Sequence, residues 1–545
     1  MLKILPLIIT GLFLFSCKQK TSVDLIIEHG VIYPVDSALS VAEAMAVIDG
    51  KIVAVGSDAA ISEKYLAKET IDAKGQFVYP GFIDAHAHFT GYGLGLQTID
   101  LVGTESWEDI LHRLNDQGKS TDSSNWLIGR GWDQNDWPVK EFPGKEKLDS
   151  MFPHRPVFLT RVDGHAAIAN QAALDRSGVK AGYTLSGGQV ETKNGQLTGI
   201  LIDNAVALVR KNIPAVSITQ FKRALLQAQQ NCLAVGLTTV DDCGLDYETI
   251  LLIDSLQKTG ELKMRIYAML SDNKKNFDFI STKGKIKTDL LNVRSFKVYA
   301  DGALGSRGAC LLQPYTDKPD WTGFLLSSAA HFDSVAGILQ KLGLQMCTHA
   351  IGDSGNRVVL QIYARHLQGK NDLRWRIEHA QVINQNDFKL FGENNIVPSV
   401  QPTHATSDMY WATDRLGKER VKGAYAYHDL LNQNGWLPLG TDFPVEDISP
   451  FKTFYAAVVR KDAKGFPENG FQVENALSRI DALRGMTIWA AKANFEETEK
   501  GSLEKGKFAD FIILDQDIMK TDPAKILQTQ VITTFVNGHE VYKKQ

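Results

Sequence analysis

The sequence predicts an α/β protein with a (β/α)8 TIM-like barrel, a small β-sandwich formed from both termini, and a large insertion after the first barrel strand. Through the middle of the chain, strand-like apolar runs alternate with longer amphipathic stretches, as in residues 218–234 followed by 237–240. Short β-rich runs broken by glycine occur at both ends, and one region rich in Trp, Gly and Pro interrupts the alternation. Alternating β and α signals favour a parallel sheet, and at 545 residues an eight-stranded barrel is the natural candidate.

The two ends of the chain have the same β-rich character. Near the N-terminus such runs lie at 25–27, 44–48, 51–55 and 76–79, with the hairpin signal Asp49-Gly50 between the second and third, and runs at 508–514 and 531–542 resemble them. We therefore expect residues 17–78 and 495–545 to form one composite β-sandwich domain, and residues 79–494 to form the barrel.

The interrupting region extends from about residue 107 to 202 and contains the segment Gly129-Arg-Gly-Trp-Asp-Gln-Asn-Asp-Trp-Pro138. Long irregular segments within a compact domain are commonly lids or binding loops. We interpret this region as an inserted lid and specificity element, in which Trp132, Asp133 and Trp137 wall the substrate pocket. Plain core packing is the alternative for the tryptophans.

The first residues have the pattern of a bacterial lipoprotein signal peptide. Lys3 precedes a short apolar run, which ends in Leu14-Phe-Ser-Cys17. This ending resembles a lipobox, which implies that residues 1–16 are removed, that Cys17 carries lipid, and that the protein is anchored to a membrane of the bacterial cell envelope, outside the cytoplasm. A secreted protein with a chance cysteine is the alternative, and periplasmic or surface-facing placement stays open.

Charge and cysteine content exclude some classes of function. The 59 basic and 63 acidic residues give a net charge of −4, so no electrostatic attraction to nucleic acid is expected. The other cysteines, Cys232, Cys243, Cys310 and Cys347, form no CxxC pair, so a thiolate zinc site is not indicated and buried free thiols are expected.

A His-x-His pair, His86 and His88, follows the segment Tyr79-Pro-Gly-Phe-Ile-Asp84. Side chains two apart on a strand share a face, so both imidazoles can reach one metal ion. Four further polar residues each close an apolar or strand-like run: Lys297, His349, His379 and Asp442.

The spacing of these residues matches barrel units of about 31 residues, whose functional groups lie at the C-terminal ends of the strands. The step from His349 to His379 is 379 − 349 = 30 residues, one unit, and that from His379 to Asp442 is 442 − 379 = 63, two units. We therefore assign His349, His379 and Asp442 to strands five, six and eight, and Lys297 to strand four. The 209 residues from His88 to Lys297 exceed three units, and the excess matches the insertion.

Together these motifs resemble the amidohydrolase superfamily, and the resemblance covers nearly the whole mature chain. The segments Phe296-Lys-Val-Tyr-Ala-Asp-Gly-Ala-Leu-Gly-Ser-Arg307, His349-Ala-Ile-Gly-Asp353, Glu378-His-Ala-Gln381 and Gly440-Thr-Asp-Phe-Pro-Val445 are similar to its amidohydrolase-3 branch, which includes N-substituted formamide deformylase-like proteins. The resemblance implies that His86 and His88 bind one divalent metal, that His349 and His379 bind a second, and that a carboxylated Lys297 bridges both. Two zinc ions are the expected cofactors, with Asp442 as ligand and general base.

The alternative for Lys297 is an ion pair with Asp301 or a neighbouring acid, which would leave a mononuclear site. An ammonium has no lone pair, so Lys297 ligates only after reaction with carbon dioxide.

On the substrate side, His165 is a candidate donor to the substrate carbonyl or tetrahedral oxyanion, and a satisfied loop histidine is its alternative. Asp301 and Arg307 flank a Gly-rich turn after Lys297, where they bind a charged substrate group or pair with each other. Glu378 is expected to support the site from behind His379, and His404 is a weaker pocket candidate.

The resemblance implies hydrolysis of a C–N bond in a small-molecule amide, N-formyl compound or cyclic amide. Two alternatives stay open: a mononuclear deaminase of an aminated ring, and a lipid-anchored binding protein that has lost catalysis. Such deaminases generally lack the lysine of strand four, so Lys297 counts against the first. A small-molecule substrate and the membrane are the expected partners, with a homo-oligomer left open.

Overall fold

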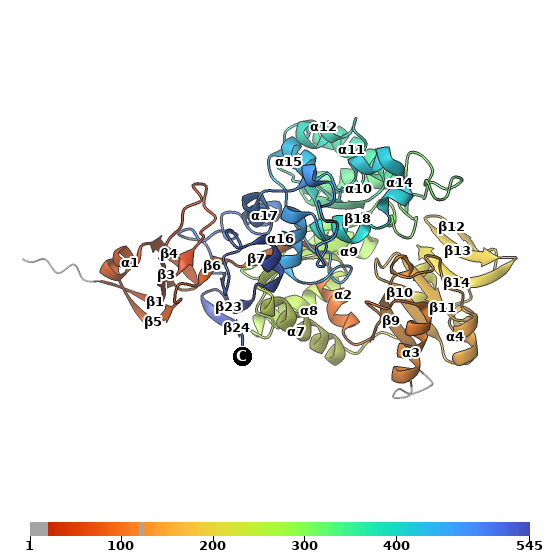
Figure 1. Ribbon diagram of the computed structural model, residues 1–545, viewed down its shortest axis with the longest axis horizontal. Coiled ribbons are helices and arrows are strands. Elements are labelled where there is room, and N and C mark those ends of the chain that lie inside the picture. Colours follow the sequence, from red (N-terminus) through yellow and green to blue (C-terminus); the bar gives the residue numbers. More distant parts are fainter. Residues whose placement is uncertain (1–19, 119–124) are drawn as a thin grey trace, which may run out of the picture.

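The computed structural model describes residues 20–118 and 125–545; the predicted signal peptide and Cys17 lie outside these residues. In Figure 1 the N-terminal strands lie at one end of the molecule, the barrel at its centre and the inserted sheet at the other end.

The centre is a parallel barrel, which confirms the predicted fold class. Its strands are neighbours in chain order, and each pair in the path is parallel. They are β7 (Phe82–Ala87), β15 (Leu237–Leu245), β16 (Arg265–Ser271), β18 (Leu291–Tyr299), β19 (Gln345–Ala350), β20 (Arg376–His379) and β21 (Val397–Ser399). The short β17 (Ile286–Lys287) pairs with β18. Nearly every residue of these strands is buried, as expected for a parallel sheet covered by helices.

An irregular segment fills the eighth position of the barrel. Val400 forms a parallel bridge with Leu439, whose carbonyl accepts a hydrogen bond of 3.1 Å from the Ala85 N–H on β7. Asp442 N–H then donates to the His86 carbonyl at 2.8 Å. Residues 437–442 therefore connect β21 to β7 and place Asp442 beside the end of β7.

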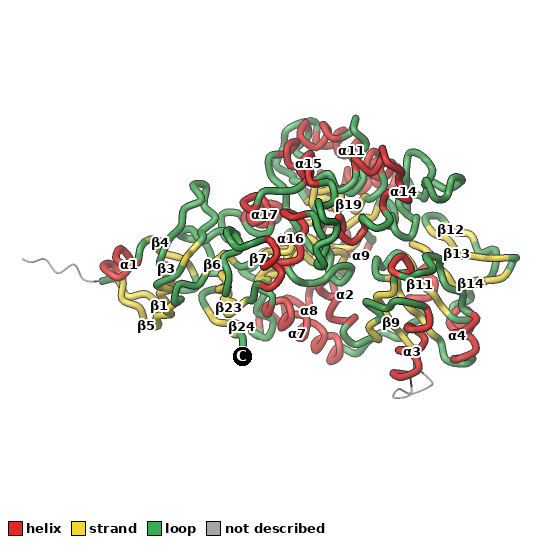
Figure 2. Tube along the Cα trace, viewed as in Figure 1, coloured by secondary structure: helices red, strands yellow, loops and turns green. Residues whose placement is uncertain are grey.

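Helices occupy the connections between barrel strands (Figure 2). Long amphipathic helices follow the pattern predicted for residues 218–234, where Ser217 and Gln220 form a capping box at the N-terminus of α7. The helices of this region are α2 (Phe89–Gly95), α7 (Ile218–Ala234), α8 (Tyr247–Lys258), α9 (Lys274–Lys283), α10 (Ala329–Leu342), α11 (Asp353–Leu367), α12 (Phe388–Glu393), α13 (Pro402–Asp408), α14 (Ala412–Arg420), α15 (Tyr427–Asn434), α16 (Pro450–Val459), α17 (Arg479–Gly485) and α18 (Ile488–Ala493).

Two sheets near the termini enclose a separate apolar core. One contains β1 (Thr21–Glu28), β3 (Ala44–Ile48), β4 (Lys51–Gly56) and β5 (Tyr65–Asp72), with α1 (Asp58–Lys64) between its last two strands. The other joins β2 (Val31–Ile32) and β6 (Phe77–Pro80) to β22 (Phe511–Leu514), β23 (Val531–Val536) and β24 (His539–Lys543). Met45, Val78 and Phe535 belong to the shared core. Both ends of the chain thus contribute strands to one sheet.

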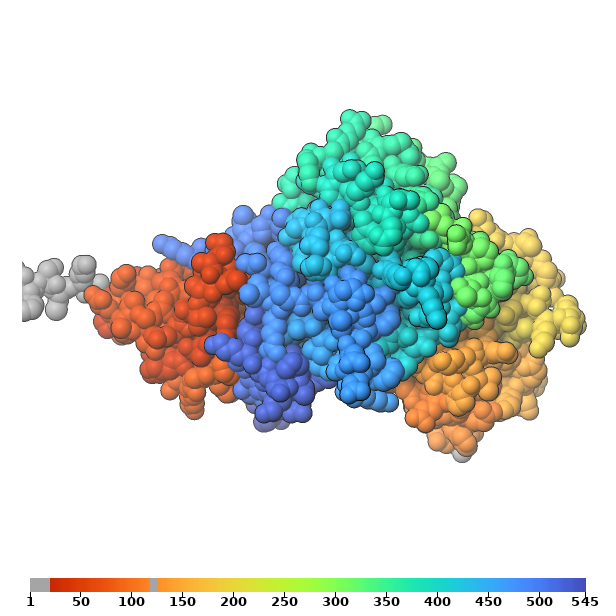
Figure 3. Space-filling view, turned by 45° about the horizontal axis from the view of Figure 1, so that its top comes forward, coloured from red at the N-terminus to blue at the C-terminus, as the bar shows by residue number. Residues whose placement is uncertain are grey.

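The segment between β7 and α7 forms a third, seven-stranded sheet. Its strands are β8 (Ile99–Asp100), β9 (Leu127–Trp132), β10 (Val157–Arg161), β11 (Ala166–Ala169), β12 (Thr184–Leu185), β13 (Gly188–Lys193) and β14 (Gln196–Asp203). It is accompanied by α3 (Trp107–Gly118), α4 (Glu146–Met151), α5 (Gln171–Arg176) and α6 (Val206–Arg210). In Figure 3 these orange and yellow residues lie against green and cyan residues of the barrel. We call residues 99–203 the inserted sheet.

Within residues 20–118 and 125–545, no helix combines the length and apolar character needed to cross a membrane. The four cysteines in this part of the chain are unpaired; Cys232, Cys243 and Cys347 are buried, whereas Cys310 is partly exposed, contrary to the expectation for that residue.

Candidate functional site

The carboxyl ends of the barrel strands converge on one group of polar side chains. His86 lies on β7, Lys297 on β18, His349 on β19 and His379 at the last position of β20. The strand register aligns Tyr299 with His349, and Ala350 with His379. Because parallel strands end at the same edge of a barrel, residues separated by hundreds of positions face one space.

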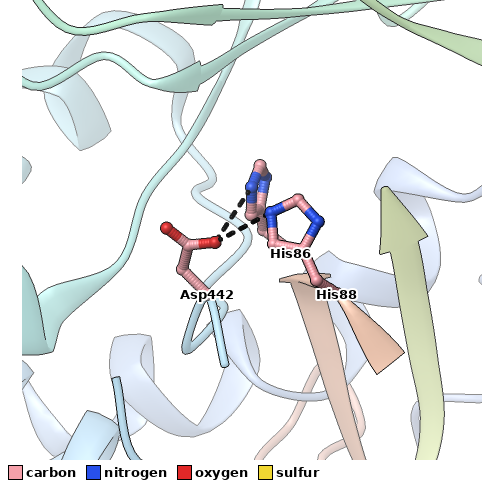
Figure 4. A group of neighbouring side chains, drawn as sticks. All are labelled: His86, His88 and Asp442. Atoms are coloured by element: carbon pink, nitrogen blue, oxygen red, sulfur yellow. Dashed lines mark ion pairs between the residues drawn. The ribbon is translucent and has the colours of Figure 1, made fainter. Parts of the chain in front are cut away.

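His86, His88 and Asp442 form the centre of this group (Figure 4). Asp442 Oδ1 lies 3.5 Å from His86 Nε2 and 3.3 Å from His88 Nε2. This oxygen is buried and has no hydrogen-bond partner among the described residues. A buried carboxylate oxygen facing two imidazole nitrogens is the arrangement that a divalent cation would satisfy.

Each of three histidines has its Nδ1 engaged on the side away from the centre. His86 Nδ1 lies 2.6 Å from Glu378 Oε2, His88 Nδ1 lies 3.2 Å from the Cys243 carbonyl oxygen, and His379 Nδ1 lies 2.7 Å from Gln401 Oε1. Oxygen partners of this kind orient metal-binding imidazoles and make the other nitrogen a better ligand. Glu378 thus lies where it was expected, behind the site.

The electrostatic environment keeps the buried histidines neutral. Burial and the nearby charge of Lys297 lower the pKa of His86 to about 4. Burial and neighbouring histidines hold the pKa values of His349 and His379 well below the usual range. Neutral imidazoles offer the lone pairs that metal ligation requires. The donor set therefore fits a metal ion.

Asp442 is held as a carboxylate. Burial would raise its pKa, but the hydrogen bond with His404 and the nearby imidazoles of His88, His86 and His379 outweigh burial and hold the pKa well below its usual range. His404 Nε2 lies 3.2 Å from Asp442 Oδ2, and His404 Nδ1 lies 3.2 Å from Glu446 Oε1. Asp442 has a left-handed backbone with φ of 63°, a conformation that is costly for Asp and typical of functional positions.

A second potential group of ligands shares Asp442. His379, His404 and Asp442 have ligand atoms within 4.8 Å of one another, and the His349 and His379 rings are 4.6 Å apart between centroids. His404, a weaker candidate from the sequence, therefore lies as close to this centre as the predicted ligands.

Lys297 lies beside the first group and is nearly fully buried. Its Nζ is 3.0 Å from His86 Nε2, and it forms no ion pair within 4.0 Å in the described part of the chain. The alternative of an ion pair with Asp301 is therefore not realised.

His165, a residue of the inserted sheet, lies beside the barrel residues of this site. Its ring centroid lies 4.9 Å from that of His349, and its Nδ1 is 2.6 Å from Asp203 Oδ1. Burial would lower the pKa of His165, but Asp203 outweighs burial and raises it above the usual value. A protonated ring can donate hydrogen bonds from both nitrogens.

A cavity of about 220 Å³ lies between the barrel and the inserted sheet. Of the residues described above, it is lined by His88, His165, Lys297, His349, His379, His404 and Asp442. The inserted sheet contributes Asp133, Arg161, Asp163 and His165, and the α13–α14 region contributes Asp408 and Trp411. A space of this volume suits a small molecule.

Three predicted substrate-binding residues lie elsewhere. Trp132 is fully buried in the core of the inserted sheet, where its Nε1 donates to the Leu159 carbonyl. The Asp301 carboxylate is fully buried and accepts three backbone hydrogen bonds of 2.8–3.0 Å, so it organises the loop after β18. Arg307 pairs with Asp317 at 2.8 Å and not with Asp301. Of the four residues proposed to bind substrate, only Asp133 lines the cavity.

Several cavity residues were not predicted. Arg161 forms ion pairs with Asp133 and Asp163, and Glu446 contacts His404. Arg161 and Asp163 stand in the same segment as His165, a signal that could have drawn attention to them.

Comparisons with known proteins agree with this site. The model of the family described as "Amidohydrolase family" matches residues 69–542. The putative amidohydrolase YtcJ of Bacillus subtilis is 32% identical over 515 residues, covering 92% of this chain and 96% of that protein. The N-substituted formamide deformylase of Arthrobacter pascens is 26% identical over 543 residues, covering 96% and 98%.

The fold is similar to that of a solved structure described as an uncharacterized metal-dependent hydrolase from Pyrococcus horikoshii. The TM-score is 0.74 and the identity 26%, covering 92% of this chain and 99% of that one. With the buried His/Asp centre at the barrel mouth and a family match over most of its length, the chain belongs to the amidohydrolase family and is a metal-dependent hydrolase.

Proposed function

We propose that the protein hydrolyses a C–N bond of a small-molecule amide, N-formyl compound or cyclic amide. The observation that carries this proposal is the buried, unpartnered Asp442 Oδ1, which faces the Nε2 atoms of His86 and His88. The Arthrobacter relative, named for deformylation of N-substituted formamides, supports the choice of bond because the two sequences align over nearly their full lengths.

The proposed cofactors are two zinc ions. His86, His88 and Asp442 would hold one ion, His349 and His379 the other, and Lys297 would bridge them as a carbamate, formed when its neutral amine adds to carbon dioxide and releases a proton. When bound, the ions would supply Lewis acidity for the attacking water and for the substrate carbonyl.

Asp442 would act as general base. His404 engages Oδ2 of Asp442, so Oδ1 would use one lone pair toward the metal ion and the other to orient the attacking water and accept its proton. Asp442 would then pass this proton to the departing amine. His165, which lines the same cavity, would donate a hydrogen bond to the carbonyl oxygen as negative charge develops there.

Metal content tests the bridged two-metal site. Purified wild-type protein is expected to contain two metal ions per chain by elemental mass spectrometry, and Lys297→Ala fewer. Lys287→Ala is the matched control, because Lys287 pairs with Glu496 and Glu499 outside the cavity. One ion per wild-type chain, or unchanged content in Lys297→Ala, would contradict the bridge.

Activity separates the proposal from its two rivals. A panel of N-formyl, N-acyl and cyclic amides is assayed beside aminated rings, with metal-replete protein. Turnover of amides supports the proposal, release of ammonia from the rings alone supports a deaminase, and tight binding without turnover supports a binding protein.

We further propose that Cys17 carries a lipid that anchors the protein in a bacterial envelope. Membrane fractionation of cells expressing wild type or Cys17→Ser tests this. Equal amounts of both proteins in the membrane fraction would contradict the anchor.

A further inference from the structure

The inserted sheet contains a buried carboxylate to which the mechanism above assigns no role. Asp203 is the last residue of β14, and its side chain is fully buried. Its Oδ1 lies 2.6 Å from His165 Nδ1, whereas the His165 side chain keeps 16% of its surface exposed and lines the cavity. The carboxylate thus lies behind the histidine, and the histidine lies between it and the substrate space.

Two hydrogen bonds hold these residues together. Besides the contact between side chains, the Asp203 N–H donates to the His165 carbonyl at 2.7 Å. With Nδ1 engaged by Asp203, Nε2 is the ring nitrogen left to address a substrate. The ring also packs against His349, so it lies beside the proposed metal ligands.

The barrel closes the other side of the Asp203 carboxylate. A Cβ at Gly302 would lie 2.4 Å from Asp203 Oδ2, and a Cβ at Gly308 would lie 2.2 Å from it. Only glycine at both positions admits the carboxylate in its present place. Asp203 also has a left-handed backbone with φ of 51°. The two glycines of the barrel and the backbone conformation of Asp203 in the inserted sheet thus both determine where the carboxylate lies.

We propose that Asp203 is a positioning residue that fixes the His165 ring so that Nε2–H points to the carbonyl oxygen of the substrate. This inference rests on the proposed hydrolysis, in which that oxygen gains negative charge. The inserted sheet then contributes a donor to the reaction itself, in addition to the wall of the pocket. A donor aimed at a developing oxyanion accelerates a reaction only when its direction is fixed beforehand.

Crystal structures of Asp203→Ala and Asn204→Ala test the positioning directly, without any substrate. Asn204 is the matched control, because its side chain bonds the Ser186 and Leu326 carbonyls at the same strand end and forms no hydrogen bond with His165 in the described part of the chain. The ring is expected to turn or become disordered in Asp203→Ala and to stay in place in Asn204→Ala. An unchanged ring in Asp203→Ala would overturn the inference. If Asp203→Ala does not fold, Asp203→Leu replaces it, because leucine is of similar size and offers no hydrogen-bond acceptor to His165, and its crystal structure is read in the same way.

Kinetics test the consequence for catalysis. Loss of one oxyanion donor costs about 100- to 1000-fold in kcat, so His165→Gln is expected to lose about that factor. Asp203→Asn is expected to lose about tenfold or more in kcat, with KM changed less than about twofold and metal content unchanged. The double variant is expected to be no slower than His165→Gln, because both changes remove one function.

Losses that multiply in the double variant, or a loss confined to KM, would overturn the inference. If wild-type protein hydrolyses no compound of the panel, the proposed function fails, and the orientation of the ring in the crystal still decides whether Asp203 positions His165.

Discussion

Glu378 offers the sharpest test of how the protein supports its metal centre. The Glu378 carboxylate and the His86 imidazole are both fully buried, and Glu378 Oε2 lies 2.6 Å from His86 Nδ1. Burial alone would raise the pKa of Glu378, but His86 and Arg376 outweigh burial and lower it to about 2. The side chain is therefore charged at every pH at which the protein would be assayed.

Glu378→Gln keeps the size of the side chain and a hydrogen-bond acceptor for His86 Nδ1–H, but removes the negative charge that makes Nε2 a better ligand. Loss of such partners typically weakens metal binding by about 10- to 100-fold, which is about 1.4 to 2.7 kcal/mol of binding free energy. We expect a weakening within this range, because the contact is short and no solvent screens it.

The assay is competition between the protein and a chelator of known affinity, followed by zinc content at equilibrium. Glu496→Gln is the matched control: Glu496 is equally buried and bonded to Lys500 and Lys287, but does not contact the centre. Its variant is expected to lose stability and keep the zinc dissociation constant. A Glu378→Gln protein with the wild-type dissociation constant would refute the supporting role of Glu378.

Three further predictions concern residues around the centre. Asp301→Asn places an amide NH2 against backbone N–H donors, so we expect denaturant titration to show a free energy of unfolding lower by about 1 to 3 kcal/mol, and kinetics to show an unchanged KM. A rise in KM without a loss of stability would indicate instead that Asp301 binds substrate. Burial raises the pKa of Asp84 to about 7 despite hydrogen bonds from Thr441. The neutral carboxyl therefore stabilises the metal-free protein below about pH 4, and this stabilisation, on the order of 4 kcal/mol, is lost as the pH rises through about 7. Denaturation at pH 4.5 and 8 is expected to show a smaller fall in Asp84→Asn, and an equal fall would contradict the assignment. Gly440→Ala would bring a Cβ to 2.6 Å from the His86 backbone nitrogen, so we expect a lower melting temperature and reduced metal content; wild-type values for both would be inconsistent with this contact.

The barrel and the strand ends that face its mouth were predictable because their signal is local and periodic. His349 and His379 each close a short apolar run, and their spacing equals one barrel unit, so position along the chain gives position around the barrel. The segment before Asp442 was assigned to strand eight by the same spacing, although hydrogen bonds alone, without a regular strand, complete the barrel there.

Other parts of the site depend on contacts that spacing does not encode. Asp203 is the last residue of β14, whereas His165 lies 38 residues earlier, just before β11, and nothing in the sequence near Asp203 marks it as a partner. Asp301 and Arg307 were placed near the mouth by their distance from Lys297. In the loop that follows β18, the Asp301 carboxylate instead accepts hydrogen bonds from backbone N–H groups, and Arg307 pairs with Asp317. Trp132 shows the same limit, since composition identified the inserted region but not which face of β9 is its core.

The hydrogen bond from Asp442 N–H to the His86 carbonyl has a consequence for how relatives of this protein could differ in substrate specificity. It joins the proposed base to the first predicted ligand through the barrel backbone, whereas Asp133, Arg161 and His165 come from a sheet inserted between two barrel strands. The predicted metal centre thus belongs to the barrel, whereas the inserted sheet supplies one wall of the cavity. Exchanging residues 99–203 between relatives would transplant specificity while leaving the spacing of His86 and Asp442 intact, provided that the glycines facing Asp203 accompany the graft.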